Sequence, residues 1–98
     1  MDASALLDGI KERAAGVPAL GSTLKMDFGD FKVYVDGTGE SNVVSSVDED
    51  ADCVISMTPE DFMALVSGDL NPMMAMMTGK VKIKGDMGVA MKLQSLLG

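Results

Sequence analysis

Residues 58–98 constrain the fold most, because they contain two marked helix starts, an alternating strand and a final helix. Thr58-Pro59 marks the first start, since the hydroxyl can cap free amides and proline needs no amide hydrogen in a first turn. Ser67-Gly68 supplies a stop. The pattern predicts a short amphipathic helix, with apolar positions at helical spacing: Phe62, Met63, Leu65 and Val66.

A second start follows at Asn71-Pro72, and Thr78-Gly79 ends this second helix. The helix between them has almost no polar face, and a helix that is apolar all round has to be buried. We therefore expect its side chains inside the protein: Met73, Met74, Ala75, Met76 and Met77.

Strict alternation over residues 80–84 predicts a strand in which Val81 and Ile83 face the core and three lysines face outward. Gly85 is interpreted as a turn residue, Gly88 as a close-packing residue, and Asp86 can cap the last helix. The apolar side expected for that helix consists of Met87, Ala90, Met91, Leu93 and Leu97.

These elements carry a resemblance. The run LNPMMAMMTGKVKIKGDMGVAMKLQSLL, with the preceding EDFMALVSG, resembles the C-terminal half of the sterol carrier protein type 2 domain, a non-enzymatic lipid-binding fold. The resemblance implies an apolar tunnel with the final helix as its lid. The lining positions it implies are Phe62, Leu65, Met73, Met76, Met77, Ile83, Met87, Met91 and Leu96, to which the expected sheet adds Leu24 and Met26.

The first half of the chain predicts a helix ending near residue 15 and a hairpin. Gly29-Asp30 is a two-residue turn of the type II′ kind, which sets Met26 opposite Val33 and Asp27 opposite Lys32. A less regular strand through residues 40–47 should lie at a sheet edge, and residues 51–57 should form a fourth strand. The order predicts an α+β fold over residues 1–98 as a single domain, with a five-stranded, mostly antiparallel sheet covered by helices on one face.

Composition excludes several functions. A net charge of −7 argues against nucleic acid as a partner, because binding its phosphates needs a basic surface. The chain has no histidine, and no serine or cysteine has a base at a recognisable spacing, so we expect no enzyme, cofactor or metal site. The acidic run around Asp48 is interpreted as a solvated loop. Cys53 is expected to be a buried, unreactive thiol, and the chain to be soluble and cytoplasmic.

Two functional hypotheses stay open. The first is a soluble carrier that holds a fatty acid, a fatty-acyl-CoA or a sterol-like lipid and has a possible lipid-metabolising enzyme partner. The second is an interaction module whose methionine-rich groove binds a partner helix, because methionine is flexible and polarizable. Outward lysines on a strand either prevent edge-to-edge aggregation or contact lipid headgroups at a membrane surface. The candidates for headgroup contact are Lys80, Lys82, Lys84 and Lys92.

Overall fold

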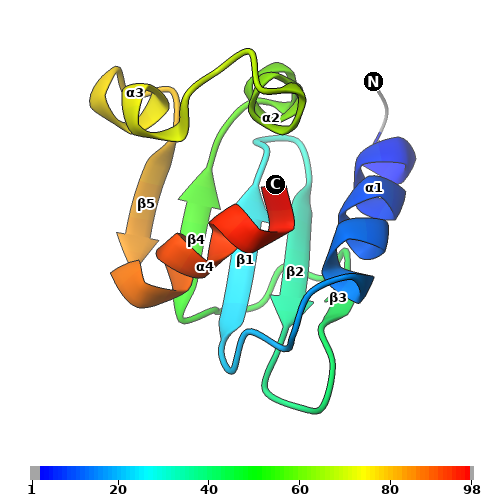
Figure 1. Cartoon of the computed structure of the whole chain (residues 1–98). Coiled ribbons are helices and arrows are strands. Elements are labelled where there is room, and N and C mark those ends of the chain that lie inside the picture. The colour runs from blue at the N-terminus through cyan, green and yellow to red at the C-terminus, as the bar shows by residue number, and fades with distance from the viewer. Residues whose placement is uncertain (1–2, 98) are drawn as a thin grey trace.

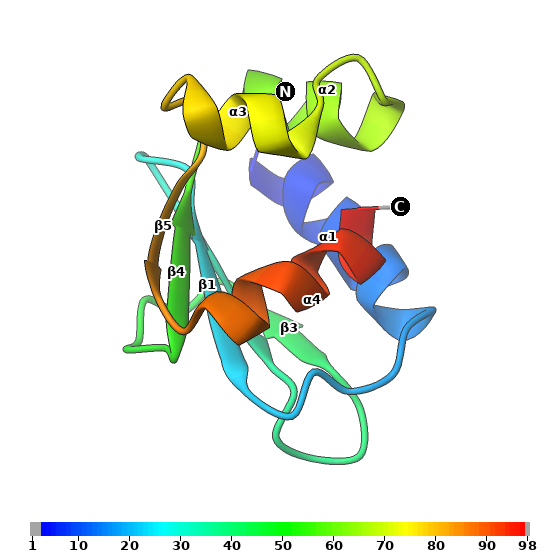
Figure 2. The same cartoon turned by 60° about the vertical axis from the view of Figure 1, so that its left-hand side comes forward.

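Helices cover one face of a five-stranded sheet and leave the other face open (Figures 1 and 2). The structure is a computed structural model that describes the backbone of residues 3–97 and the side chains of residues 4–92. Its elements in chain order are α1 (Ala3–Ala15), β1 (Thr23–Asp27), β2 (Lys32–Asp36), β3 (Val43–Ser45), β4 (Cys53–Ser56), α2 (Pro59–Ser67), α3 (Pro72–Met77), β5 (Lys82–Gly85) and α4 (Met87–Leu97).

The strand order is β3-β2-β1-β4-β5, and only the central pairing of β1 with β4 is parallel. The other three pairings are antiparallel, so the predicted α+β fold with a mostly antiparallel sheet is confirmed. The parallel pair follows from the chain path, because β4 returns beside β1 after the β1-β2-β3 meander. The short β3 lies at an edge, as predicted, although it is shorter than the expected range of 40–47.

The hairpin of β1 and β2 has the predicted register. Met26 pairs with Val33, and Asp27 pairs with Lys32. Gly29 has a φ of 90°, a backbone conformation that residues other than glycine rarely adopt. On the open face the Lys32 ammonium lies 3.1 Å from the Asp27 carboxylate, so the predicted opposite-charge pair is also present.

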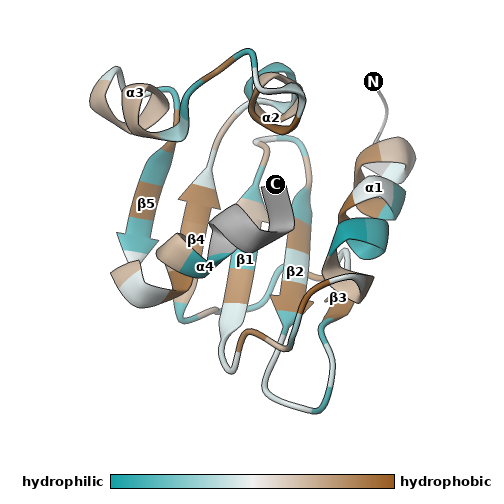
Figure 3. Ribbon diagram, viewed as in Figure 1, coloured by the Kyte–Doolittle hydropathy of each residue, from teal (hydrophilic) through white to brown (hydrophobic). Residues whose placement is uncertain are grey.

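The core is entirely apolar. Alternate side chains of β1, β2 and β4 lie on the face of the sheet that the helices cover. Leu24, Val35 and Ile55 are completely buried there. Figure 3 shows these hydrophobic positions as brown bands along the strands. Within residues 4–92 no polar or charged side chain is buried. Cys53 is buried as predicted, and its burial raises the pKa of the thiol above 9.0.

A tight passage from β5 into α4 holds that helix on the sheet. Gly85 has a φ of 105°, and a Cβ at this position would collide with the backbone carbonyl of Asp52. The Asp86 amide donates to the same Asp52 oxygen at 2.8 Å, and the Asp86 carboxylate accepts from the Gly88 amide at 2.8 Å. Gly85 as a turn residue and Asp86 as a cap are therefore both confirmed.

The strand β5 begins later than the alternation predicts. The amides of Lys80 and Val81 donate to the Ala75 carbonyl at 2.9 and 3.1 Å, which closes α3 before the sheet pairing begins at Lys82. Val81 is buried and Ile83 packs partly buried against the core, as expected. No helix in the part of the chain that the structure describes is long and apolar enough to cross a membrane.

Replacing Gly85 with alanine should destabilise the fold by about 1–3 kcal/mol or more, because the positive φ and the Asp52 carbonyl both oppose a Cβ. Gly39→Ala is the matched control, since a Cβ there meets no atom within 4 Å. Urea unfolding followed by circular dichroism measures both variants. Equal stability of the two would contradict this account of the β5–α4 passage.

Candidate functional site

The predicted lining residues fall into two separate groups in the structure. Four belong to the core: Leu24, Met26, Phe62 and Leu65 are at most 8% exposed. Ile83 is partly buried at the edge of the same core. The predicted lining methionines of α3 and α4 are exposed instead. The structure therefore does not bring the predicted residues together around one open tunnel, and their role as lining stays a prediction.

The expectation that α3 is buried is wrong. Met73, Met74, Met76 and Met77 are 70%, 53%, 43% and 78% exposed, and Ala75 is the one fully buried residue of this helix. The physical reason is position, because α3 lies beyond the end of β5 rather than over the sheet (Figure 1). A helix without a polar face is expected to be buried. Its sequence does not show whether another element of the fold lies close enough to bury it.

The expected apolar side of α4 is confirmed at Ala90 but wrong at Met87 and Met91. Val89 and Ala90 are buried against the sheet, whereas Met87 and Met91 are 52% and 72% exposed. Leu93 and Leu97 were expected on the same side, and Leu96 was a predicted lining residue, but the side chains of all three lie outside the described residues. We call the exposed thioethers of α3 and α4 the methionine surface: Met73, Met74, Met76, Met77, Met87 and Met91.

Helix α2 reaches the core mainly through one aromatic contact. The Thr58 hydroxyl accepts from the Asp61 amide at 3.1 Å and caps the helix, and Gly68 ends it in the left-handed conformation, both as predicted. The Phe62 ring meets the Phe28 ring edge-on, with 5.7 Å between centroids. Phe62 also borders a narrow void that is too small for water and is lined as well by Ile10, Arg13 and Met26.

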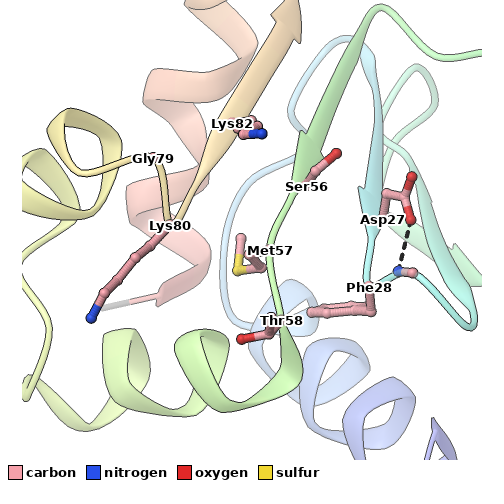
Figure 4. A pocket seen from close by; sticks show the side chains of 9 residues that line it. Asp27, Phe28, Ser56, Met57, Thr58, Gly79, Lys80 and Lys82 are labelled. Atoms are coloured by element: carbon pink, nitrogen blue, oxygen red, sulfur yellow. Dashed lines mark hydrogen bonds between the residues drawn. The ribbon is translucent and has the colours of Figure 1, made fainter.

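A hollow of about 350 Å³ opens where β4 and β5 separate (Figure 4). We call it the strand-end hollow. The sequence patterns missed it, because it exists only where strand pairing ends. Its walls combine the core residues Phe28 and Met57 with two hydroxyls and two lysines. Its complete lining is Asp27, Phe28, Gly29, Ser56, Met57, Thr58, Gly79, Lys80 and Lys82.

The negative charge of this hollow is already compensated. The Asp27 carboxylate accepts from the Gly29 amide at 2.8 Å and pairs with Lys32, and these contacts lower the pKa of Asp27 below 3.8. Lys80 and Lys82, by contrast, form no ion pair with any residue that the structure describes. The strand-end hollow therefore has cationic groups to offer to an anion.

The four candidate headgroup lysines do not form one patch. Lys82 and Lys84 pair with Ser56 and Val54 across the open face of the sheet. Lys92 lies on α4, on the helix-covered face, where its ammonium donates to the Leu20 carbonyl at 2.7 Å. The grouping of Lys92 with the strand lysines is wrong, because the sheet separates them.

Other charged residues of the open face support the structure. The Lys25 ammonium lies 2.8 Å from the Asp48 carboxylate, and Asp52 and Thr23 exchange hydrogen bonds of 2.8 and 3.1 Å. These contacts tie part of the predicted acidic loop to β1. A separate hollow on this face is lined by Lys25, Asp27, Asp50, Ala51, Val54, Ser56, Lys84 and Gly85.

The fold and these surfaces define a class of small α+β proteins in which helices cover one face of a single sheet around an apolar interior. The chain belongs to the SCP-2 sterol transfer family, whose profile matches residues 4–98. The resemblance to this family seen in the second half of the sequence is thereby confirmed.

Individual relatives support this family membership. The chain is 50% identical to human (Homo sapiens) "Sterol carrier protein 2" over 58 residues. These aligned residues cover 59% of this chain and 11% of that protein. It therefore matches only a small part of that relative's length. The crystal structure of sterol carrier protein 2 like 2 from Aedes aegypti has a TM-score of 0.71 at 21% identity and covers 92% of this chain and 91% of that one. A solution structure of the palmitated Aedes aegypti protein has a TM-score of 0.69 at 22% identity and covers 99% and 95% of the two chains.

Mild oxidation with hydrogen peroxide should separate the methionines by exposure. Met73, Met77 and Met91 should become sulfoxides early, because their thioethers are 70% to 78% exposed. Met26 is 1% exposed and should react only when the protein unfolds. Peptide mass spectrometry over time measures each site. Equal protection of Met26 and Met77 in ligand-free protein would contradict the exposed position of α3.

Proposed function

We propose that this chain is a non-catalytic carrier that binds a fatty-acyl or sterol-like lipid between its helices and its sheet. Membership of the SCP-2 sterol transfer family supports a lipid as ligand. The palmitated state of the Aedes aegypti structure supports an acyl chain in particular. A lipid-metabolising enzyme as partner stays part of the proposal.

The observation that carries this proposal is the position of the methionines. Six large apolar side chains of α3 and α4 are more than two-fifths exposed beside a core that contains no buried polar group. Such a surface is costly in water and usually marks a place where another molecule binds. Methionine suits a guest of variable shape, because its unbranched thioether repacks easily.

The energetics of an acyl guest are favourable without a polar anchor inside the protein. Each buried methylene contributes roughly 0.8 kcal/mol, so a sixteen-carbon chain offers on the order of 10 kcal/mol. Lost freedom and ordering of the helices remove about half of this, which leaves roughly 5 kcal/mol and a dissociation constant on the order of 0.1 mM. The narrow void beside Phe62 is a place in the core where such a guest could begin to part the side chains.

The side chains available for acid–base or nucleophilic chemistry do not favour a catalytic role. The chain has no histidine to transfer protons near neutral pH. Its only cysteine is buried, and this burial raises the pKa of the thiol, which disfavours the thiolate that acts as a nucleophile. Binding and release of a ligand are therefore a better account of this chain than a reaction.

The proposal predicts that freshly purified protein contains lipid detectable by native mass spectrometry. Met76→Asp should weaken uptake of cis-parinaric acid, a fluorescent fatty acid, at least about tenfold, because a carboxylate on the methionine surface opposes contact with an acyl chain.

Val43→Asp is the matched control, since Val43 is equally apolar and 62% exposed on β3, away from α3 and α4. Its uptake should equal that of the wild type. Wild-type uptake by Met76→Asp would contradict the carrier. Absence of lipid together with capture of an amphipathic helix would favour the interaction module instead.

A further inference from the structure

The strand-end hollow arises from the way the backbone leaves the sheet. Ser56 and Lys82 form the last pair of β4 and β5. Beyond it the Met57 amide donates to the Asp27 carbonyl at 3.0 Å, whereas the Lys80 amide turns to the Ala75 carbonyl of α3. The two chains therefore part at this point, and the gap between their side chains is the hollow of about 350 Å³.

One side of this hollow comes from a segment that carries only positive charge. Residues 70–85 contain three of the eight basic residues of the chain and none of its fifteen acidic ones. Lys80 and Lys82 are exposed and unpaired within the described residues. Figure 4 shows them pointing in different directions, but each ammonium sits on a flexible four-carbon stem that can turn toward a shared anion.

The floor of the hollow leads toward the core. Phe28 and Met57 line the hollow and are each only 6% exposed. Phe28 contacts Phe62 edge-on, and Phe62 borders the narrow void that also touches Met26. The Phe28–Phe62 pair therefore connects the lining of the hollow with the lining of the void. A guest that enters the core from the hollow would have to part this pair.

Helix α2 is well suited to such a displacement. It has nine residues, and only Phe62 and Leu65 of these are buried. Elements with few buried apolar contacts open at lower free energy than the rest of a structure. A guest that replaces the Phe62 contacts with its own methylenes would offset the cost of moving the ring.

We propose that the strand-end hollow is the headgroup site of the carrier, in which Lys80 and Lys82 bind the carboxylate of a long-chain fatty acid. The acyl chain passes between Met57 and Phe62 into the core. This inference rests on the proposed function and adds a preference for an ionised head.

The apolar lining of the interior is the reason to expect a charged headgroup at the rim and not inside the core. No polar side chain is buried within residues 4–92, and the backbone groups of the strands already pair with each other, so a polar head inside the core would lose its hydrogen bonds with water and find few partners. At the rim a carboxylate can accept charge-assisted hydrogen bonds from both ammonium groups and from the Ser56 and Thr58 hydroxyls. A neutral ester or a sterol hydroxyl gains much less there.

The test compares tritiated palmitate with tritiated methyl palmitate, which has the same acyl chain without the charge. In wild-type protein palmitate should bind about tenfold more tightly than the ester. The double variant Lys80→Ala, Lys82→Ala should lose this difference through weaker palmitate binding alone. Lys84→Ala is the matched control, because Lys84 lies on the same strand but lines the other hollow. It should keep the preference.

The outcomes separate the two proposals. Unchanged palmitate affinity in the double variant, or an equal loss for both ligands, overturns the headgroup site while the carrier function stands. If wild-type protein binds neither ligand, the carrier function itself fails. Circular dichroism of all variants establishes that exposed lysines were removed without unfolding the protein.

Discussion

The contact between Phe28 and Phe62 is the constraint on which the organisation of this protein depends. The sheet has one apolar face, and α1 and α4 lie beside it and cover much of it (Figure 2). The end of that face near Phe28 is covered by α2, whose buried contribution consists of Phe62 and Leu65. Few side chains of α2, chiefly Phe62 and Leu65, thus cover the core near the place where β4 and β5 separate. Under the proposed function, a cover with so few buried contacts is the part of the fold that opens at least cost.

Local patterns in the sequence predicted the features that depend on neighbouring residues. The hairpin register followed from alternation and from Gly29, which has the positive φ that its turn needs. The capped start of α2 followed from Thr58 and its stop from Gly68, and Asp86 caps α4 as predicted. Each of these depends on residues within a few positions of each other, so periodicity and capping chemistry were sufficient.

Features that depend on distant partners could not be predicted in this way. The exposure of Met77 reflects the position of α3 beyond the sheet, which the composition of that helix does not encode. Lys92 contacts the carbonyl of Leu20, 72 positions away in the chain, and so lies apart from the strand lysines. The Asn42 side chain accepts from the Leu20 amide at 2.9 Å and donates to the Pro18 carbonyl at 3.0 Å, a tertiary contact that no local motif marks.

The central claim is that an acyl chain enters the core by displacing Phe62. Its most direct test is a solution NMR study of the protein with ¹³C-labelled palmitate, in which contacts between ligand and protein protons are observed. The account predicts contacts from the chain methylenes to Phe28, Met57 and Phe62 as well as to Met76 of the methionine surface, with the carboxyl end near Lys80. Contacts confined to exposed Met73 and Met77, with the Phe28 and Phe62 signals unchanged, would contradict it.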